Sequence, residues 1–179
     1  MIQARTRILS LLTALVILTC SLVSCGTSSD TAPMGFKEIS DPEVTYHLYV
    51  PDEWITDVST GMTSAYYDGR DPSNISMTAF ELDGTVTSVA DYWALYEADF
   101  KAIFPDMEYV DAVECTLDDV AAMQYIYTAT MSDIQYKFMQ VIALRQGQVY
   151  IFTYTATAEK YDTHIEDVIA ILDYFSFKK

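Results

Sequence analysis

The chain has 179 residues, of which 51% are hydrophobic and 20% charged, and this composition indicates a folded domain of ordinary size and excludes a disordered chain. Its formal net charge is −16. A surface this acidic repels nucleic acid and anionic lipid headgroups, so we expect no nucleic-acid partner.

The first 24 residues have the composition of a secretory signal. Arg5 and Arg7 are their only charged residues, and an apolar run without charge extends from Ile8 to Leu22. This run has about 15 residues, whereas a helix needs about 20 to cross a bilayer. We therefore expect residues 1–24 to be a signal peptide; the alternatives are an uncleaved membrane helix and an ordinary secretory signal.

The apolar run ends in Leu22-Val23-Ser24-Cys25, which resembles the lipobox of bacterial lipoproteins. The resemblance implies cleavage between Ser24 and Cys25 and attachment of lipid to the Cys25 thiol. Because two or more acyl chains hold a protein stably, the expected location is the extracytoplasmic face of the cell membrane. The small and polar residues that follow predict a flexible tether over residues 25–35.

Residues 36–179 show the periodicities of one domain that mixes strands and helices. Short links at 131–133 and 145–147 require the strands that they join to be antiparallel neighbours. The predicted strands are 36–39, 45–50, 63–67, 75–82, 120–130, 134–144, 148–157 and 174–177, and the predicted helices are 88–104 and 158–172.

Each predicted helix has a start signal and an apolar stripe. Ser88 can cap the first helix with Asp91 three residues later, and Pro105 ends it. Thr157 precedes the second helix. The residues expected to pack on the sheet are Val89, Tyr92, Trp93, Tyr96, Phe100, Ile103 and Phe104 in the first helix, and Tyr161, Ile165, Val168 and Leu172 in the second.

This order of elements predicts an α+β domain in which an antiparallel sheet is flanked by helices. The domain, residues 36–179, resembles the PsbP/Mog1-like family, including PsbP-related bacterial lipoproteins. The features that carry the resemblance are Phe36-Lys37-Glu38-Ile39, Tyr46–Val50 followed by Pro51-Asp52-Glu53-Trp54, Asp91-Tyr92, Val149–Ala156 and Tyr174–Phe177. The resemblance implies an α/β/α sandwich whose known members act by docking, one type in photosystem assembly and another on a small GTPase. No functional residue of those members maps onto this chain.

Catalytic motifs are absent from the sequence, and we predict that the protein is not an enzyme. The EF-hand, HExxH, P-loop, GxGxxG and GxSxG patterns do not occur. Cys115 could pair with His47 or His164 as a thiol and imidazole, but the three lie in different predicted elements. A lone cysteine is more often a small buried hydrophobe.

Two groups of acidic residues could bind a divalent cation. They are Asp118-Asp119 and the pair Asp68 and Asp71. Hard cations need several converging oxygen ligands, and two acids in a turn are common without a metal. We therefore predict neither a metal site nor a cofactor.

Three aromatic residues beside turns, Trp54, Tyr66 and Tyr67, are the candidate interface residues. The alternative is that they close the open end of the sheet. The resulting hypothesis is a non-enzymatic, lipid-anchored module that binds or assembles an unidentified envelope protein. The second hypothesis is a small-molecule or divalent-cation binder with a cleft between the first helix and the sheet. A thiol enzyme that uses Cys115 is the third.

Overall fold

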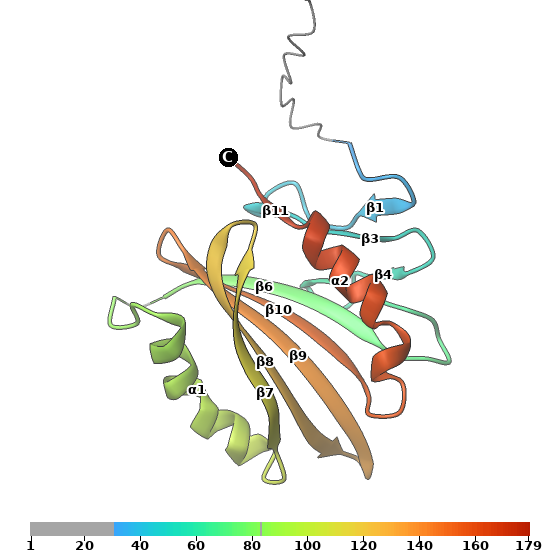
Figure 1. Cartoon of the computed structure of the whole chain (residues 1–179). Coiled ribbons are helices and arrows are strands. Elements are labelled where there is room, and N and C mark those ends of the chain that lie inside the picture. Colours follow the sequence, from blue (N-terminus) through green and yellow to red (C-terminus); the bar gives the residue numbers. More distant parts are fainter. Residues whose placement is uncertain (1–30, 83) are drawn as a thin grey trace, which may run out of the picture. The chain divides into compact units, whose positions relative to one another are not determined.

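The fold is built on one large antiparallel sheet (Figure 1). A computed structural model describes residues 31–82 and 84–179. Within these residues the largest sheet has seven strands in the order β4–β5–β6–β10–β9–β8–β7, and two smaller sheets pair β1 with β3 and β11 with β2. The strands are β1 (Phe36–Glu38), β2 (Tyr46–His47), β3 (Tyr49–Pro51), β4 (Ile55–Asp57), β5 (Thr63–Tyr66), β6 (Asn74–Glu81), β7 (Glu108–Leu117), β8 (Val120–Met131), β9 (Ile134–Arg145), β10 (Gln148–Thr157) and β11 (Ser176–Phe177).

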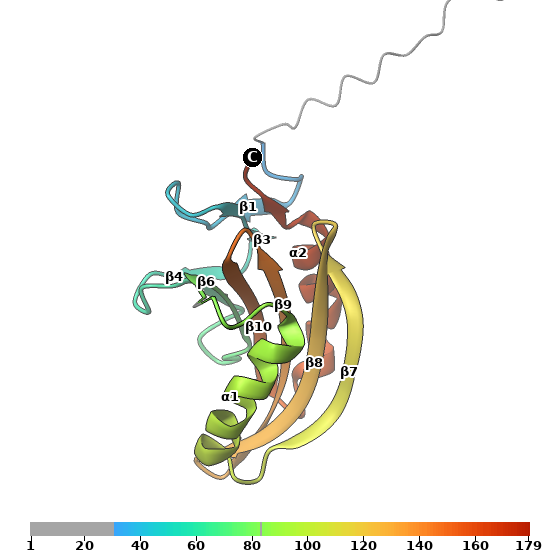
Figure 2. The same ribbon diagram turned by 90° about the vertical axis from the view of Figure 1, so that its left-hand side faces the viewer.

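Side chains alternate along the central strands and form two separate cores, one on each face of the sheet. Tyr125 and Tyr127 of β8 belong to the core under helix α1 (Val89–Ile103). Phe152 and Tyr154 of β10 belong to the core under helix α2 (Ile165–Tyr174). The sheet is therefore the middle layer between the two helices (Figure 2). This arrangement confirms the predicted α+β fold.

The four strands β7–β8–β9–β10 form a meander in which two-residue turns join consecutive strands. Both residues of each turn have positive φ values between 46° and 80°, which is the geometry of a type I′ hairpin turn. This turn matches the right-handed twist of the strands, so the hairpins need no longer loop. The turn residues are Asp118 and Asp119, Ser132 and Asp133, and Gln146 and Gly147.

Helix α1 forms as the sequence predicts. The Ser88 Oγ accepts a hydrogen bond of 3.0 Å from the Asp91 N–H and so caps the helix. Trp93 lies flat on Tyr125 of β8, with ring centroids 4.0 Å apart and planes 10° apart. One residue of the predicted stripe is an exception: Ile103 is 67% exposed, although Phe100 and Phe104 on either side of it pack against the core.

Helix α2 is shorter than the predicted helix 158–172. It begins at Ile165, and a turn of 3₁₀-helix, Tyr161–Thr163, precedes it. The Tyr154 hydroxyl donates a hydrogen bond of 2.8 Å to the Tyr161 carbonyl. That carbonyl would accept from the Ile165 N–H in a continuous α-helix, and the start predicted at Thr157 is therefore wrong.

The prediction omitted strands β4 and β7 and merged β2 with β3. Seven consecutive residues at the start of β7 are exposed, and Glu108, Asp111 and Glu114 interrupt its apolar pattern, because it is the outer strand of the sheet. β2 and β3 are separate because β2 pairs with β11 whereas β3 pairs with β1. The meander therefore has four strands where three were expected.

The replacement Trp93→Ala should lower the free energy of unfolding by about 3–5 kcal/mol, because it removes a buried ring that stacks on the sheet. The replacement Leu95→Ala is the matched control, since Leu95 lies on the same helix and is 56% exposed. We expect the control to cost less than about 1 kcal/mol. Urea unfolding followed by circular dichroism measures both, and equal losses would contradict the packing of α1 described above.

Candidate functional site

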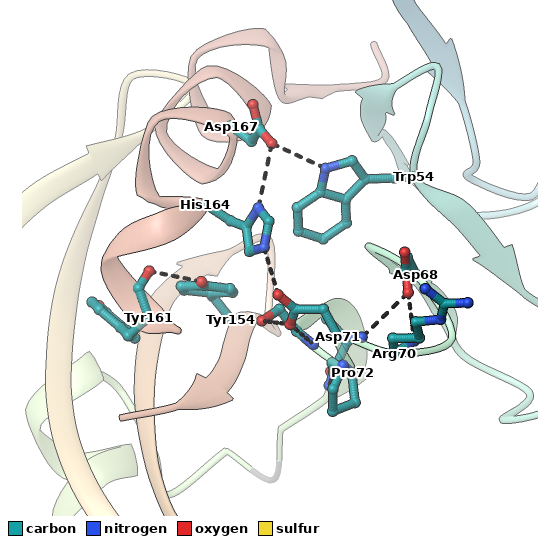
Figure 3. A network of polar contacts seen from close by, with 11 residues as sticks. Trp54, Asp68, Arg70, Asp71, Pro72, Tyr154, Tyr161, His164 and Asp167 are labelled. Carbon is teal, nitrogen blue, oxygen red and sulfur yellow. Dashed lines mark hydrogen bonds and ion pairs between the residues drawn. The ribbon is translucent and has the colours of Figure 1, made fainter. Parts of the chain in front are cut away.

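Among the places in the described chain that gather polar or ionisable groups from distant segments, two are candidate sites. The first, the histidine cluster, consists of Trp54, Asp71, His164 and Asp167, which Figure 3 labels, together with Tyr67. The second, the edge pocket, opens beside strands β4, β5 and β6.

His164 is the centre of the histidine cluster and is only 5% exposed. Its Nε2 lies 3.1 Å from Asp71 Oδ2, and its Nδ1 lies 4.0 Å from Asp167 Oδ2. The same Asp167 oxygen accepts a hydrogen bond of 3.2 Å from the Trp54 indole N–H. The imidazole therefore lies between two carboxylates that come from different elements.

The Asp71 carboxylate is held ionised by its neighbours. Burial alone would raise its pKa, but hydrogen bonds from the Ser73 hydroxyl and from His164 outweigh this effect and lower the pKa below its usual value. The Tyr67 ring covers His164, with centroids 4.0 Å apart. The cluster thus joins α2, the loop that follows β5 and the residue before β4. Its polar groups form hydrogen bonds and ring contacts with one another.

Trp54, Tyr66 and Tyr67 are the candidate interface residues of the sequence prediction, and the structure places them differently. Trp54 is 0% exposed, so it is not available as an interface residue; it belongs to the core on the α2 side. His164, named in the sequence only as a possible partner of Cys115, is buried. Tyr66 and Tyr67 are half-buried, and only Tyr67 belongs to the cluster. The spacing of His164 and Asp167 by three residues on one helix was the available sequence signal.

The proposed thiol and imidazole pairs do not form in the described residues. Cys115 is half-buried against the core on the α2 side, and burial raises the pKa of its thiol. A nucleophilic thiol needs a lowered pKa. His47 instead lies 2.8 Å from Glu38 through its Nδ1.

The acidic pairs are also separated from other ligands. Asp118 accepts a hydrogen bond of 2.7 Å from the Phe177 N–H and so connects the β7–β8 turn to β11. Asp68 accepts from the N–H groups of Arg70 and Asp71, within its own loop. Within residues 31–82 and 84–179, no group of three or more His, Cys, Asp or Glu side chains is arranged to hold a metal ion.

The edge pocket has a volume of about 630 Å³ and is lined by three segments, 39–46, 56–64 and 77–80. It combines the carboxylates of Asp41 and Asp57 with apolar side chains, of which Val58 is 86% exposed and Met62 45% exposed. The second hypothesis placed a cleft between the first helix and the sheet, but Tyr92 and Trp93 fill that space.

Sequence reasoning missed the edge pocket. Its loop, residues 58–62, has neither a helical nor a strand period, and its two apolar residues, Val58 and Met62, lie among Ser, Thr and Gly. The available signal in the sequence was the presence of two apolar residues in a short polar loop. The pocket itself arises from segments that are distant in the sequence.

The predicted cleavage and lipidation residues, Ser24 and Cys25, lie outside the described residues, as do the signal peptide and much of the tether. They remain predictions. Of the helices that the structure describes, none has the length and apolar character needed to cross a membrane.

Comparison with known proteins identifies the fold. No protein-family model matches the chain, and no curated protein matches it in sequence. Three of the solved structures that are similar in fold illustrate the match. The cyanobacterial PsbP protein (CyanoP) of Synechocystis sp. PCC 6803 is 17% identical with a TM-score of 0.61, and the match covers 87% of this chain and 98% of that one.

The other two structures come from distant organisms. LpqN of Mycobacterium tuberculosis, described as involved in cell envelope biogenesis, is 19% identical with a TM-score of 0.56, and the match covers 80% of this chain and 91% of that one. The Ran-binding protein Mog1p of Saccharomyces cerevisiae is 8% identical with a TM-score of 0.58, over 81% of this chain and 96% of that one. The chain therefore has a PsbP/Mog1-like fold, as predicted.

The replacement Asp71→Asn should destabilise the protein at neutral pH and flatten its acid unfolding. Because the folded-state pKa of Asp71 is lowered, its contribution to stability is present above the unfolded pKa of about 3.9 and is lost as the pH falls through the folded pKa. The difference in free energy of unfolding between the two proteins should therefore shrink below about pH 4.

Urea unfolding at pH values from neutral to strongly acidic measures this difference. The control is Asp173→Asn, an exposed position on α2. If the difference in free energy of unfolding between the original protein and Asp71→Asn stays constant down to the lowest pH, the carboxylate does not interact as described.

Proposed function

We propose that the chain is a lipid-anchored, non-catalytic module that binds a protein on the extracytoplasmic face of a bacterial membrane. The observation that carries the proposal is the edge pocket, where apolar and acidic side chains are open to solvent at the end of the large sheet. Exposed apolar side chains that gather around a hollow, with polar groups among them, are typical of interaction sites.

The state of the reactive groups supports a role without catalysis. The imidazole of His164 is enclosed by two carboxylates and two aromatic rings. The thiol of Cys115 has a raised pKa, which disfavours the nucleophilic thiolate. Neither group lines the edge pocket.

The solved structures of this fold are compatible with the proposal. Mog1p is a Ran-binding protein, so the fold can present a protein-binding surface. LpqN is involved in cell envelope biogenesis, so the fold also occurs in a protein that serves the cell envelope. Neither partner nor pathway is carried over to this chain.

The proposed anchor limits where a partner can be. If Cys25 carries the lipid, residues 26–35 separate it from the folded domain, and ten extended residues reach at most about 36 Å. A partner of the domain would then lie in the membrane or close to it.

A second candidate function is the binding of a small molecule in the same pocket. The volume of about 630 Å³ favours it, because ligand pockets usually measure about 300–1,000 Å³. A thermal shift with one compound of a broad panel, lost when Met62 is replaced by Asp, would support this second candidate against the protein-binding one.

The replacement Cys25→Ala should prevent lipid attachment, so that the protein becomes soluble or accumulates uncut. Cys115→Ala is the matched control and should keep the protein on the membrane. Incorporation of labelled palmitate and membrane fractionation after a carbonate wash measure the outcome. A Cys25→Ala protein that is cleaved and still tightly bound to the membrane would contradict the anchor.

Photocrosslinking in cells tests the protein-binding role. With p-benzoylphenylalanine in place of Met62, which is 45% exposed in the edge pocket, we expect a discrete adduct with one envelope protein. The control position is Ile134, which is 47% exposed at the start of β9 and outside the pocket. Adducts that are absent at Met62, or identical at the two positions, would contradict the proposal.

A further inference from the structure

Strand β6 has an unpaired edge in the edge pocket. It pairs with β10 from Asn74 to Glu81. β5 begins at Thr63, opposite Met77, so residues 78–81 of β6 extend beyond the end of β5. Alternate residues of an antiparallel strand direct both N–H and C=O to the same side. Two of these four residues therefore present backbone donors and acceptors where β5 is missing.

The apolar side chains of the pocket surround this edge. Val58 and Met62 come from the β4–β5 loop, Ile39 and Val44 from the segment before β2, and Phe80 from β6 itself. Phe80 is 40% exposed although it belongs to the large sheet. A strand laid along residues 78–81 would cover these groups with its own side chains.

The charged side chains that line the pocket are acidic and favour a basic partner. Of the described residues that line it, Asp41 and Asp57 are charged at neutral pH, and none is a Lys, Arg or His. Hydrogen bonds from the Ser59 hydroxyl and N–H lower the pKa of Asp57, so this carboxylate stays ionised. The Nζ of Lys178 donates to the carbonyls of Asp41 and Pro42, so one cation lies beside the pocket but does not line it.

We propose that the edge pocket binds an extended, basic peptide segment of the partner protein, which adds as a strand to residues 78–81 of β6. This inference rests on the proposed protein-binding function and specifies its mode. The backbone of the peptide supplies the hydrogen bonds that β5 does not, its apolar side chains contact Val58, Met62 and Phe80, and its Lys or Arg side chains meet Asp41 and Asp57. Four paired residues span about 13 Å.

The opposite edge of the sheet is a weaker candidate for strand addition. β7 is long, but its register shifts between Tyr109 and Asp111, which marks a bulge. Bulges and charged side chains are the usual devices that protect an edge strand from pairing. The β6 edge is short, but it lies in a pocket that has apolar walls.

The test is a binding measurement with the full chain purified in detergent micelles. The probe is a capped eight-residue peptide of alternating Lys and Val with a fluorescent label, followed by anisotropy. Two further peptides carry N-methyl groups on the Lys amides or on the Val amides, and a fourth has Glu in place of Lys. Only one set of amides can face β6, so one methylated peptide should bind at least tenfold more weakly while the other binds like the parent.

The charge requirement is tested on both partners. The Glu peptide should bind at least tenfold more weakly than the Lys peptide. The double replacement Asp41→Asn and Asp57→Asn should weaken the Lys peptide by a similar factor, and Asp173→Asn, a carboxylate removed elsewhere, should leave binding unchanged.

Several outcomes would overturn the inference. If both methylated peptides bind like the parent, no strand is added, and an adduct at Met62 in cells would then show that the protein-binding function stands without this mode. Equal binding of the Lys and Glu peptides would exclude the charge selection. A dimer in sedimentation that Met62→Asp abolishes would show that the occupant is a second copy of the chain.

Discussion

The pairing of β10 with both β6 and β9 is the interaction on which the rest of the structure depends. β10 joins the N-terminal strands β4–β6 to the meander β7–β9, and its ladder with β6 connects segments that are about 70 residues apart in sequence. It also holds residues 78–81 of β6 in strand conformation where β5 has ended. The open edge of β6 in the pocket therefore belongs to a strand that is paired with β10 on its other side.

The histidine cluster connects this sheet to α2 by a different kind of interaction. His164 bonds to Asp71 after β5, and Trp54, directly before β4, bonds to Asp167 of α2. Breaking a buried hydrogen bond of this kind leaves a polar group without its partner and is costly. Because Trp54 precedes β4 and the loop 58–62 follows it, the cluster also fixes the strand from which one wall of the pocket extends.

The parts of the fold that the sequence predicted are those with a local cause. Helix α1 has its own cap and stripe, and β8, β9 and β10 alternate regularly and are separated by short turns. β7 escaped prediction because it is an edge strand whose apolar period is interrupted by acids. Trp54 was misplaced because its burial depends on α2, more than 100 residues later. The candidate site followed the same rule, since both the cluster and the pocket are assembled from distant segments. Cys25, by contrast, is predicted from a short motif and needs no fold.

The acidic residues along β7 affect how copies of the protein meet when they are crowded. A lipid-anchored protein, as proposed here, would be confined to two dimensions, where copies meet far more often than in free solution. An exposed edge strand would then invite copies to fuse through their sheets. Glu108, Asp111 and Glu114 place three like charges along this edge, so two such edges repel when they approach. The protein could therefore cover a membrane densely and still remain a population of separate molecules.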